Sequence, residues 1–142
     1  MGQKKSDARE TSNSVLTRRP VVLLVDEDRQ GQYYYGVLLE ELGYRVRGCG
    51  SYEEAVAVLG SEPFDFVVLN QGSPGFEGRA VLERAVEIDR RLPVLVLARC
   101  LDMRCYLEAM QLGAVDYLVE PLTGWEVGRV LESHLPVQSM AA

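Results

Sequence analysis

Five strand-like segments that alternate with helix-like segments constrain the fold of this 142-residue chain more than any other feature. Four of the five are near-continuous hydrophobic stretches, as strands buried on both faces of a sheet are. The expected strands are Val21–Val25, Tyr44–Gly48, Phe66–Leu69, Val94–Leu97 and Tyr117–Val119. This alternation predicts one α/β domain, with a parallel five-stranded sheet, helices on both faces and right-handed crossovers.

Apolar residues at helical spacing predict which side of each helix packs against the sheet. The expected inward residues are Tyr34, Val37, Leu38 and Leu42 in the first helix, Tyr52, Ala55, Val56 and Leu59 in the second, Val81, Leu82, Ala85 and Ile88 in the third, and Val127, Val130 and Leu131 in the last. Two pairs have capping-box spacing at helix starts: Ser51 with Glu54, and Thr123 with Glu126. Three glycines follow expected helix ends, where a left-handed residue is favoured: Gly43, Gly60 and Gly113.

Composition divides the chain into a polar N-terminal tail (1–19), one domain (20–135) and a short C-terminal tail (136–142). The first tail holds five basic and two acidic residues, a net +3, which leaves −9 on the other 123 residues of a chain that totals −6. An acidic domain argues against direct nucleic-acid binding. Three cysteines without a C-x-x-C pair, and no membrane-spanning run, favour a cytoplasmic protein without membrane attachment.

Ligand sites in parallel α/β sheets lie at the carboxyl ends of the strands. The residues directly after the expected strands are therefore the candidates for function. They are Asp26-Glu27-Asp28 after the first, Asn70 to Gly78 after the third, Ala98-Arg99 after the fourth and Glu120-Pro121 after the fifth.

Four motifs at these positions resemble the receiver domain of response regulators over roughly residues 20–135. They read V-L-L-V-D-E-D, V-V-L-N-Q-G-S-P-G-F-E-G, P-V-L-V-L-A and G-A-V-D-Y-L-V-E-P-L. The resemblance implies a (βα)₅ flavodoxin-like or CheY-like three-layer sandwich, with strand order 2-1-3-4-5. It also implies a signalling module of a two-component phosphorelay, and not an enzyme.

Receivers of the family that this chain resembles transfer a phosphoryl group from a phosphohistidine to an aspartate after the third strand. The resemblance assigns a cation to an acidic pair, here Asp26 and Glu27, with the backbone carbonyl of Gly72. It further requires a hydroxyl after the fourth strand and a lysine after the fifth. An aromatic residue on the fifth strand, here Tyr117, then moves inward and reports the event to a partner.

Three of these positions depart from the family pattern. Asn70 replaces the nucleophilic aspartate, Ala98 the hydroxyl residue and Glu120 the lysine. Pro74 and Gly78 fix the register of the first position, and the chain contains no lysine after Lys5. The resulting phosphoacceptor site is degenerate, and we expect signalling that is independent of phosphorylation.

Two arrangements of the altered pocket are open. In the first, Mg²⁺ or Ca²⁺ still binds Asp26, Glu27 and the carbonyl of Gly72. In the second, which we favour, Arg99 supplies the missing positive charge and caps the pocket, while Asn70 donates its amide hydrogens to the carboxylates. No cofactor is then required, and any Mg²⁺ binding is weak.

The leading functional prediction is a regulatory module that contacts a protein partner, with a homodimer also plausible. The expected partner surface carries Tyr106, Tyr117 and Trp125, although Trp125 could equally serve packing. Of three neighbouring tyrosines, Tyr34 is expected to point inward. The alternatives are a conventional phosphoaccepting response regulator and the receiver fragment of a transcriptional activator. No helix-turn-helix or ATPase motif is present in these 142 residues.

Overall fold

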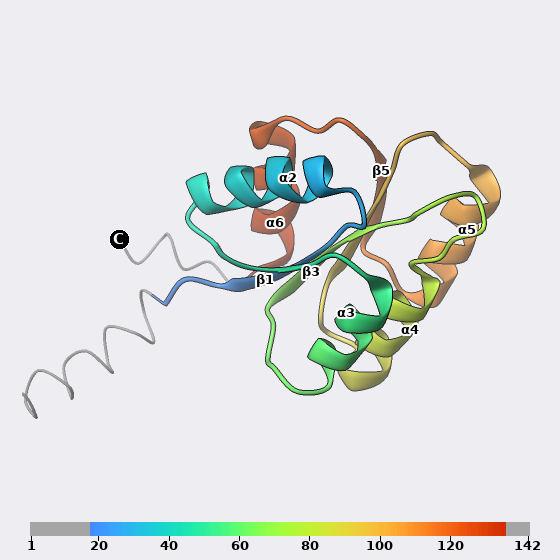
Figure 1. Cartoon of the computed structure of the whole chain (residues 1–142), viewed down its shortest axis with the longest axis horizontal. Helices are drawn as coiled ribbons and strands as arrows, with labels where there is room; N and C mark the ends of the chain where they lie inside the picture. Colours follow the sequence, from blue (N-terminus) through green and yellow to red (C-terminus); the bar gives the residue numbers. More distant parts are fainter. Residues whose placement is uncertain (1–17, 136–142) are drawn as a thin grey trace, which may run out of the picture.

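The computed structural model describes residues 18–135, which form a three-layer α/β sandwich around one five-stranded sheet (Figure 1). The elements are β1 (Val21–Val25), α2 (Arg29–Glu41), β2 (Arg45–Cys49), α3 (Tyr52–Leu59), β3 (Phe66–Asn70), α4 (Arg79–Ile88), β4 (Val94–Ala98), α5 (Met103–Leu112), β5 (Asp116–Val119) and α6 (Gly124–His134). Neighbouring strands are parallel, in the order β2-β1-β3-β4-β5. The predicted fold class and strand order are confirmed, and each strand end lies within one residue of its predicted position.

Two hydrophobic cores lie on opposite faces of the sheet because successive side chains of a strand point to opposite sides. Leu23 and Val25 of β1 pack into the core under α3, α4 and α5. Val22 and Leu24 pack into the core under α2 and α6. The predicted tails, 1–19 and 136–142, lie outside the described residues except for Arg18 and Arg19.

The buried face of α2 differs from the predicted one. Tyr35 and Leu39 are buried, whereas Tyr34, Val37 and Leu42 are 46, 36 and 39 % exposed. Apolar residues occupy so many positions of this helix that a spacing of four residues fits both 34/38/42 and 35/39. The orientation of the helix on the sheet decides between the two phases, and this orientation cannot be predicted from the periodicity of the sequence alone.

Smaller corrections concern helix ends. Ile88, the last residue of α4, is 43 % exposed. In α3, Val58 is buried in addition to the predicted residues, and Val56 is partly buried against the same core. Gly43 and Gly113 have the predicted left-handed conformation, with φ of 100° and 113°. Gly60 instead has φ −81°, because its N–H donates to Ala57 O and the chain closes α3 in a right-handed turn.

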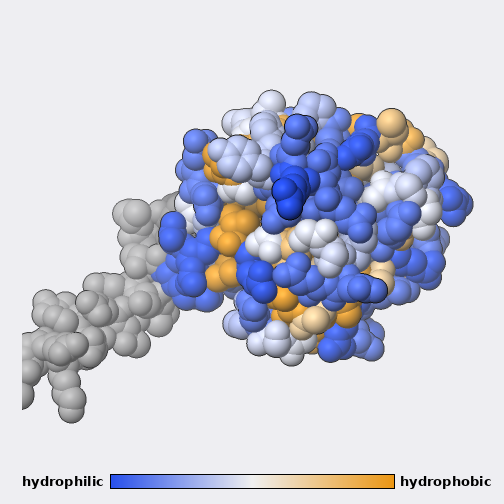
Figure 2. Space-filling view, viewed as in Figure 1, coloured by the Kyte–Doolittle hydropathy of each residue, from blue (hydrophilic) through white to orange (hydrophobic). Residues whose placement is uncertain are grey.

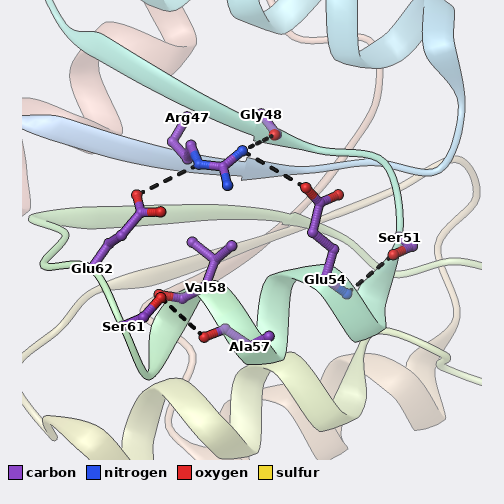
Figure 3. A network of polar contacts seen from close by, with 8 residues as sticks. All are labelled: Arg47, Gly48, Ser51, Glu54, Ala57, Val58, Ser61 and Glu62. Atoms are coloured by element: carbon purple, nitrogen blue, oxygen red, sulfur yellow. Dashed lines mark hydrogen bonds and ion pairs between the residues drawn. The ribbon is translucent and has the colours of Figure 1, made fainter.

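Of the two predicted capping boxes, the one at Thr123 and Glu126 is complete. Ser51 accepts a hydrogen bond from Glu54 N, but the Glu54 carboxylate pairs with Arg47 of β2 at 3.7 Å. Figure 3 shows the Arg47 guanidinium between Glu54 and Glu62, whose carboxylate lies 3.5 Å away. This network ties the edge strand β2 to α3, although exposed ion pairs contribute only about 0–1 kcal/mol each.

In the view of Figure 2, hydrophilic residues cover most of the surface, and hydrophobic residues form small groups among them. None of the helices between residues 18 and 135 has the length and apolar character needed to cross a membrane. We use the name α5–β5–α6 face for the surface that carries five exposed large hydrophobic side chains on these elements and just before α5: Leu101, Met103, Leu107, Val119 and Trp125.

Candidate functional site

The candidate site is a cavity of about 620 Å³ at the carboxyl ends of the strands. Parallel pairing brings the strand ends together, so that Asn70 lies opposite Leu97 and Ala98 opposite Val119. The cavity is lined by Asp26, Glu27, Asp28, Tyr52, Asn70, Gln71, Gly72, Ser73, Pro74, Glu77, Arg99, Cys100, Leu101 and Asp102. Of the predicted site residues, this set includes Asp26, Glu27, Asn70, Gly72 and Arg99.

Asn70 is held by hydrogen bonds at both ends of its side-chain amide and at its backbone oxygen. Its Nδ2 donates to Glu120 Oε2 at 2.8 Å, and its Oδ1 accepts from Gly72 N at 2.9 Å. The Tyr52 hydroxyl donates to its backbone oxygen at 3.1 Å. The donation to Glu120 is the hydrogen bond that the second pocket arrangement predicts. A neutral amide at this position carries no carboxylate oxygen that could attack a phosphoryl group.

Two carboxylates at the site are disfavoured as anions. Burial raises the pKa of Asp26, which is only 4 % exposed, although the N–H of Asp28 donates to its Oδ1 at 2.9 Å and acts in the opposite direction. Burial also raises the pKa of Glu120, against the hydrogen bond from Asn70, and the charge of Asp26 adds to the rise. The site therefore places two carboxyl groups where little water is available to stabilise their charged forms.

Arg99 lies at the rim of the cavity. Its Nη2 pairs with Asp28 Oδ2 at 2.7 Å, and its side chain remains 65 % exposed. The arrangement in which Arg99 supplies the missing positive charge and caps the pocket stays a prediction. Among the described residues Arg99 lines the cavity and pairs with Asp28, without an ion pair to Asp26 or Glu120. Its positive charge still lowers the pKa of Asp26 and of Glu120 from a distance.

Asp26, Glu27 and Gly72, the predicted cation ligands, line the same cavity. Between residues 18 and 135, no group of three or more His, Cys, Asp or Glu side chains is arranged to hold a metal ion. Asn70 Oδ1 is also engaged by Gly72 N. The donor set is therefore two carboxylates and one carbonyl, which fits a hard cation such as Mg²⁺ only in part.

Gln71 lies in the candidate segment after the third strand, but the sequence alone assigns it no role. It is 3 % exposed, its Oε1 accepts a hydrogen bond from the Tyr117 hydroxyl, and its Nε2 donates to Ser73 O at 3.0 Å. The available signal was its place directly after Asn70, at the end of a buried strand. Its partner lies 46 residues away in the sequence, so only the folded structure reveals the contact.

Tyr34 and Tyr35 hold the loop after β5 from both sides. The Tyr34 hydroxyl donates to Leu122 O at 2.9 Å, and Leu122 N donates to the buried Tyr35 hydroxyl at 3.1 Å. The prediction that Tyr34 points inward is wrong, because Tyr35 occupies the core. Burial raises the pKa of Tyr35 to about 12, with the charge of Glu120 among the further causes.

The residues of the predicted partner surface have different exposures. Tyr117 is 5 % exposed and meets the half-buried Tyr106 ring edge-to-face at 5.7 Å. Trp125 is 71 % exposed, with the Arg129 guanidinium 5.1 Å from its ring centre. Trp125 therefore belongs to the accessible surface, whereas Tyr117 supports that surface from beneath.

The family model of the response regulator receiver domain matches residues 22–129 of the chain. The C4-dicarboxylate transport transcriptional regulatory protein DctD of Rhizobium meliloti is 28 % identical over 106 residues, which cover 75 % of this chain and 23 % of that protein. The sporulation initiation phosphotransferase F of Bacillus subtilis is 26 % identical over 122 residues, with 83 % of this chain and 95 % of that protein covered.

Solved structures agree with the fold. The receiver domain protein of Methanospirillum hungatei JF-1 superposes with a TM-score of 0.77 at 20 % identity, over 87 % of this chain and 99 % of that one. The chain spans about a quarter of the length of the first curated relatives that it matches, 23 % of one and 26 % of the next.

Proposed function

Because this chain belongs to the family of response regulator receiver domains, we propose that it is a two-component signalling module which acts through protein contacts without accepting a phosphoryl group. The observation that carries the proposal is the hydrogen bond from Asn70 Nδ2 to Glu120 Oε2. In the family, the residues at these two positions receive and bind the phosphoryl group. In this chain their side chains are hydrogen-bonded to each other instead.

The chemistry of the pocket supports the same proposal. A phosphoryl acceptor needs a carboxylate nucleophile and positive charge around the transferred group. Here an amide stands at the nucleophile position, Ala98 offers no hydroxyl, and Glu120 adds negative charge. Two like unit charges about 4 Å apart repel by ~4 kcal/mol at an intermediate dielectric. Arg99, the one cation lining the cavity among the described residues, is engaged with Asp28.

We place the partner contacts on the α5–β5–α6 face. Isolated exposed apolar residues need no explanation, but Trp125 is large, rigid and accessible, which are the properties of interface anchors. The partner in this proposal is another protein, either a signalling protein, an output domain or a second copy of this chain. A cytoplasmic location, and the absence of direct nucleic-acid contacts by this acidic domain, belong to the same proposal.

A conventional phosphoaccepting regulator is the second candidate, and one observation favours it. Asp26, Glu27 and Gly72 still line one cavity, as the family's cation ligands do. Several relatives are transcriptional regulatory proteins of which this chain spans only a part. An output function of that kind would come from segments beyond the 142 residues described by the sequence.

Incubation with acetyl phosphate and Mg²⁺, followed by intact-mass measurement, separates the two candidates. We expect no phosphoryl adduct on the wild-type chain. The triple variant Asn70→Asp, Ala98→Thr, Glu120→Lys serves as the matched positive control, because it restores all three missing groups. A stoichiometric adduct on the wild-type chain contradicts the proposal and supports the conventional regulator.

A further inference from the structure

Gln71 connects the floor of the cavity to the α5–β5–α6 face. Its backbone is fixed at both ends: its N–H donates to Leu97 O at 2.7 Å, and its carbonyl accepts from Gly78 N at 3.0 Å. Its side chain uses both ends of the amide, one toward Ser73 O and one toward the Tyr117 hydroxyl. A buried glutamine held at four points has little freedom to change its rotamer.

The Tyr117 hydroxyl donates to this amide, and the end of the neighbouring strand offers no other side-chain acceptor, while the backbone of Asp102 also hydrogen-bonds the phenol. Ala98, at the end of β4, carries no hydroxyl, and the phenol is buried beneath the surface. A buried hydroxyl that loses its partner costs roughly 1–3 kcal/mol. The ring is also packed edge-to-face on Tyr106 of α5. Any rotation of Tyr117 would therefore disturb both its hydrogen bond and α5.

The start of α5 is attached to the same loop. Arg104 Nη2 donates to Pro74 O at 2.9 Å, and the Cys105 thiol points at the same oxygen at 3.4 Å. Asp102 caps the helix by accepting from Cys105 N at 3.0 Å. The loop that follows Asn70 thus holds Tyr117 through Gln71 and holds α5 through Pro74.

We infer that Gln71 is a positioning residue that fixes Tyr117 in its buried orientation and so keeps the α5–β5–α6 face in a single arrangement, with no bound phosphoryl group required. The inference rests on the proposed function in one respect, the independence from phosphorylation. The Gln71 side chain, which is always present, thus does for Tyr117 what a bound phosphoryl group would otherwise do. The face is therefore presented to its partner permanently.

A double-mutant cycle on the whole chain tests the coupling. Gln71→Met keeps the volume of the side chain and removes its hydrogen bonds, and Tyr117→Phe removes only the hydroxyl. We expect each single change to raise the unfolding equilibrium constant on the order of tenfold. The double variant should be scarcely worse than Gln71→Met alone, because that change already removes the hydrogen bond shared with Tyr117, together with the one to Ser73 O. If the double variant instead shows the product of the two single effects on the unfolding equilibrium constant, the inference is overturned.

Amide and aromatic NMR spectra give the second readout. If Gln71 only stabilised its own surroundings, its replacement would not change the chemical shifts of residues on the α5–β5–α6 face. Gln71→Met should shift the resonances of Tyr117 and of Leu101, Leu107 and Val119 on the face. The control Gln111→Met, an exposed position on α5, should shift only its neighbours. If Gln71→Met does not fold, Tyr117→Phe is examined for the same resonances. Unchanged resonances on the face in the folded variant contradict the inference.

Failure of the proposed function gives a different result. Acetyl phosphate with Mg²⁺ should leave the face resonances of the wild-type chain unchanged. A phosphoryl adduct that shifts them refutes independence from phosphorylation, and with it the permanent state of the face. An intact Gln71–Tyr117 coupling in the cycle would in that case still be measured, so the two failures are distinguishable.

Discussion

The side-chain amide of Asn70 donates to Glu120 Oε2 at 2.8 Å and joins the last residue of β3 to the first residue after β5. The amide oxygen accepts from Gly72 N, so both ends of the group are used within the protein. An aspartate at the same position would place a second carboxylate beside Glu120. Asn70 and Glu120, the two departures from the family pattern, therefore depend on each other. Restoring the aspartate at position 70 alone would bring two carboxylates into contact.

The first prediction is that Asn70→Asp alone does not restore phosphorylation. The added carboxylate faces Glu120 at hydrogen-bond distance, where like charges repel by ~4 kcal/mol at an intermediate dielectric. Neither a hydroxyl at position 98 nor a lysine at position 120 is present to bind the incoming group. Intact mass after treatment with acetyl phosphate and Mg²⁺ measures the outcome, with Asn70→Asp, Glu120→Lys as the intermediate control. An adduct on the single variant contradicts this account.

The second prediction concerns pH and Glu120. Burial raises the pKa of this carboxyl above its ordinary value of 4.5, so the folded chain holds the proton more tightly than the unfolded chain does. Stability contributed by the protonated form is complete below pH 4.5 and falls as the pH rises through the folded-state pKa. We expect Glu120→Gln to increase the free energy of unfolding at pH 7 and to change it little at pH 4.

Urea unfolding at the two pH values checks this prediction. Glu41→Gln, at an exposed position at the end of α2, is the matched control and should show no such dependence on pH. The raised pKa of Asp26 acts in the same direction and remains in both proteins. A Glu120→Gln variant that is less stable than wild type at pH 7 would mean that the carboxylate stabilises the fold through Asn70.

The sequence predicts the strands and the hydrogen bond from Asn70 to a pocket carboxylate, but it does not predict the orientation of α2 or the side-chain contacts of Gln71. Val94–Ala98 is recognisable because a strand buried on both faces must be apolar throughout. The inward face of α2 is not recognisable from the sequence, because the apolar residues of this helix fit two helix phases. The replaced groups at Asn70 and Glu120 follow from position alone, whereas the Gln71–Tyr117 contact joins residues far apart in sequence and appears only when the loop is folded.

The third prediction tests the corrected phase of α2. Leu39 is fully buried, and truncating a buried leucine to alanine costs about 2–5 kcal/mol through lost contacts and the cavity left behind. Leu42 belongs to the phase that the periodicity suggested and is 39 % exposed. We expect Leu39→Ala to lower the free energy of unfolding in that range and Leu42→Ala to lower it by clearly less. Equal losses in chemical denaturation would contradict the buried face described here.

The fourth prediction separates two neighbouring tyrosines. Tyr35→Phe leaves the buried N–H of Leu122 without its acceptor, which costs roughly 1–3 kcal/mol. Tyr34→Phe removes a donor to the Leu122 carbonyl from a half-exposed ring, where water can replace it. Thermal unfolding should therefore show a clear loss for Tyr35→Phe and a small one for Tyr34→Phe. The reverse order would indicate that Tyr34 is the residue that holds the loop.

The fifth prediction is that Mg²⁺ binds weakly to the wild-type chain and more tightly to Asn70→Asp. Asp26, Glu27 and the Gly72 carbonyl are the available oxygen ligands, and the Asn70 amide adds no charge. A carboxylate at position 70 would add a third anionic ligand. Amide shifts near Asp26 during Mg²⁺ titration provide the measurement. Saturation of the wild-type chain at millimolar Mg²⁺ or below would contradict the prediction, as would equal affinities of the two proteins. The first prediction states that Asn70→Asp forms no phosphoryl adduct. If this variant binds Mg²⁺ more tightly and still forms no adduct, then weak metal binding is not what prevents phosphoryl transfer. Glu120 and Ala98 would be the remaining barriers.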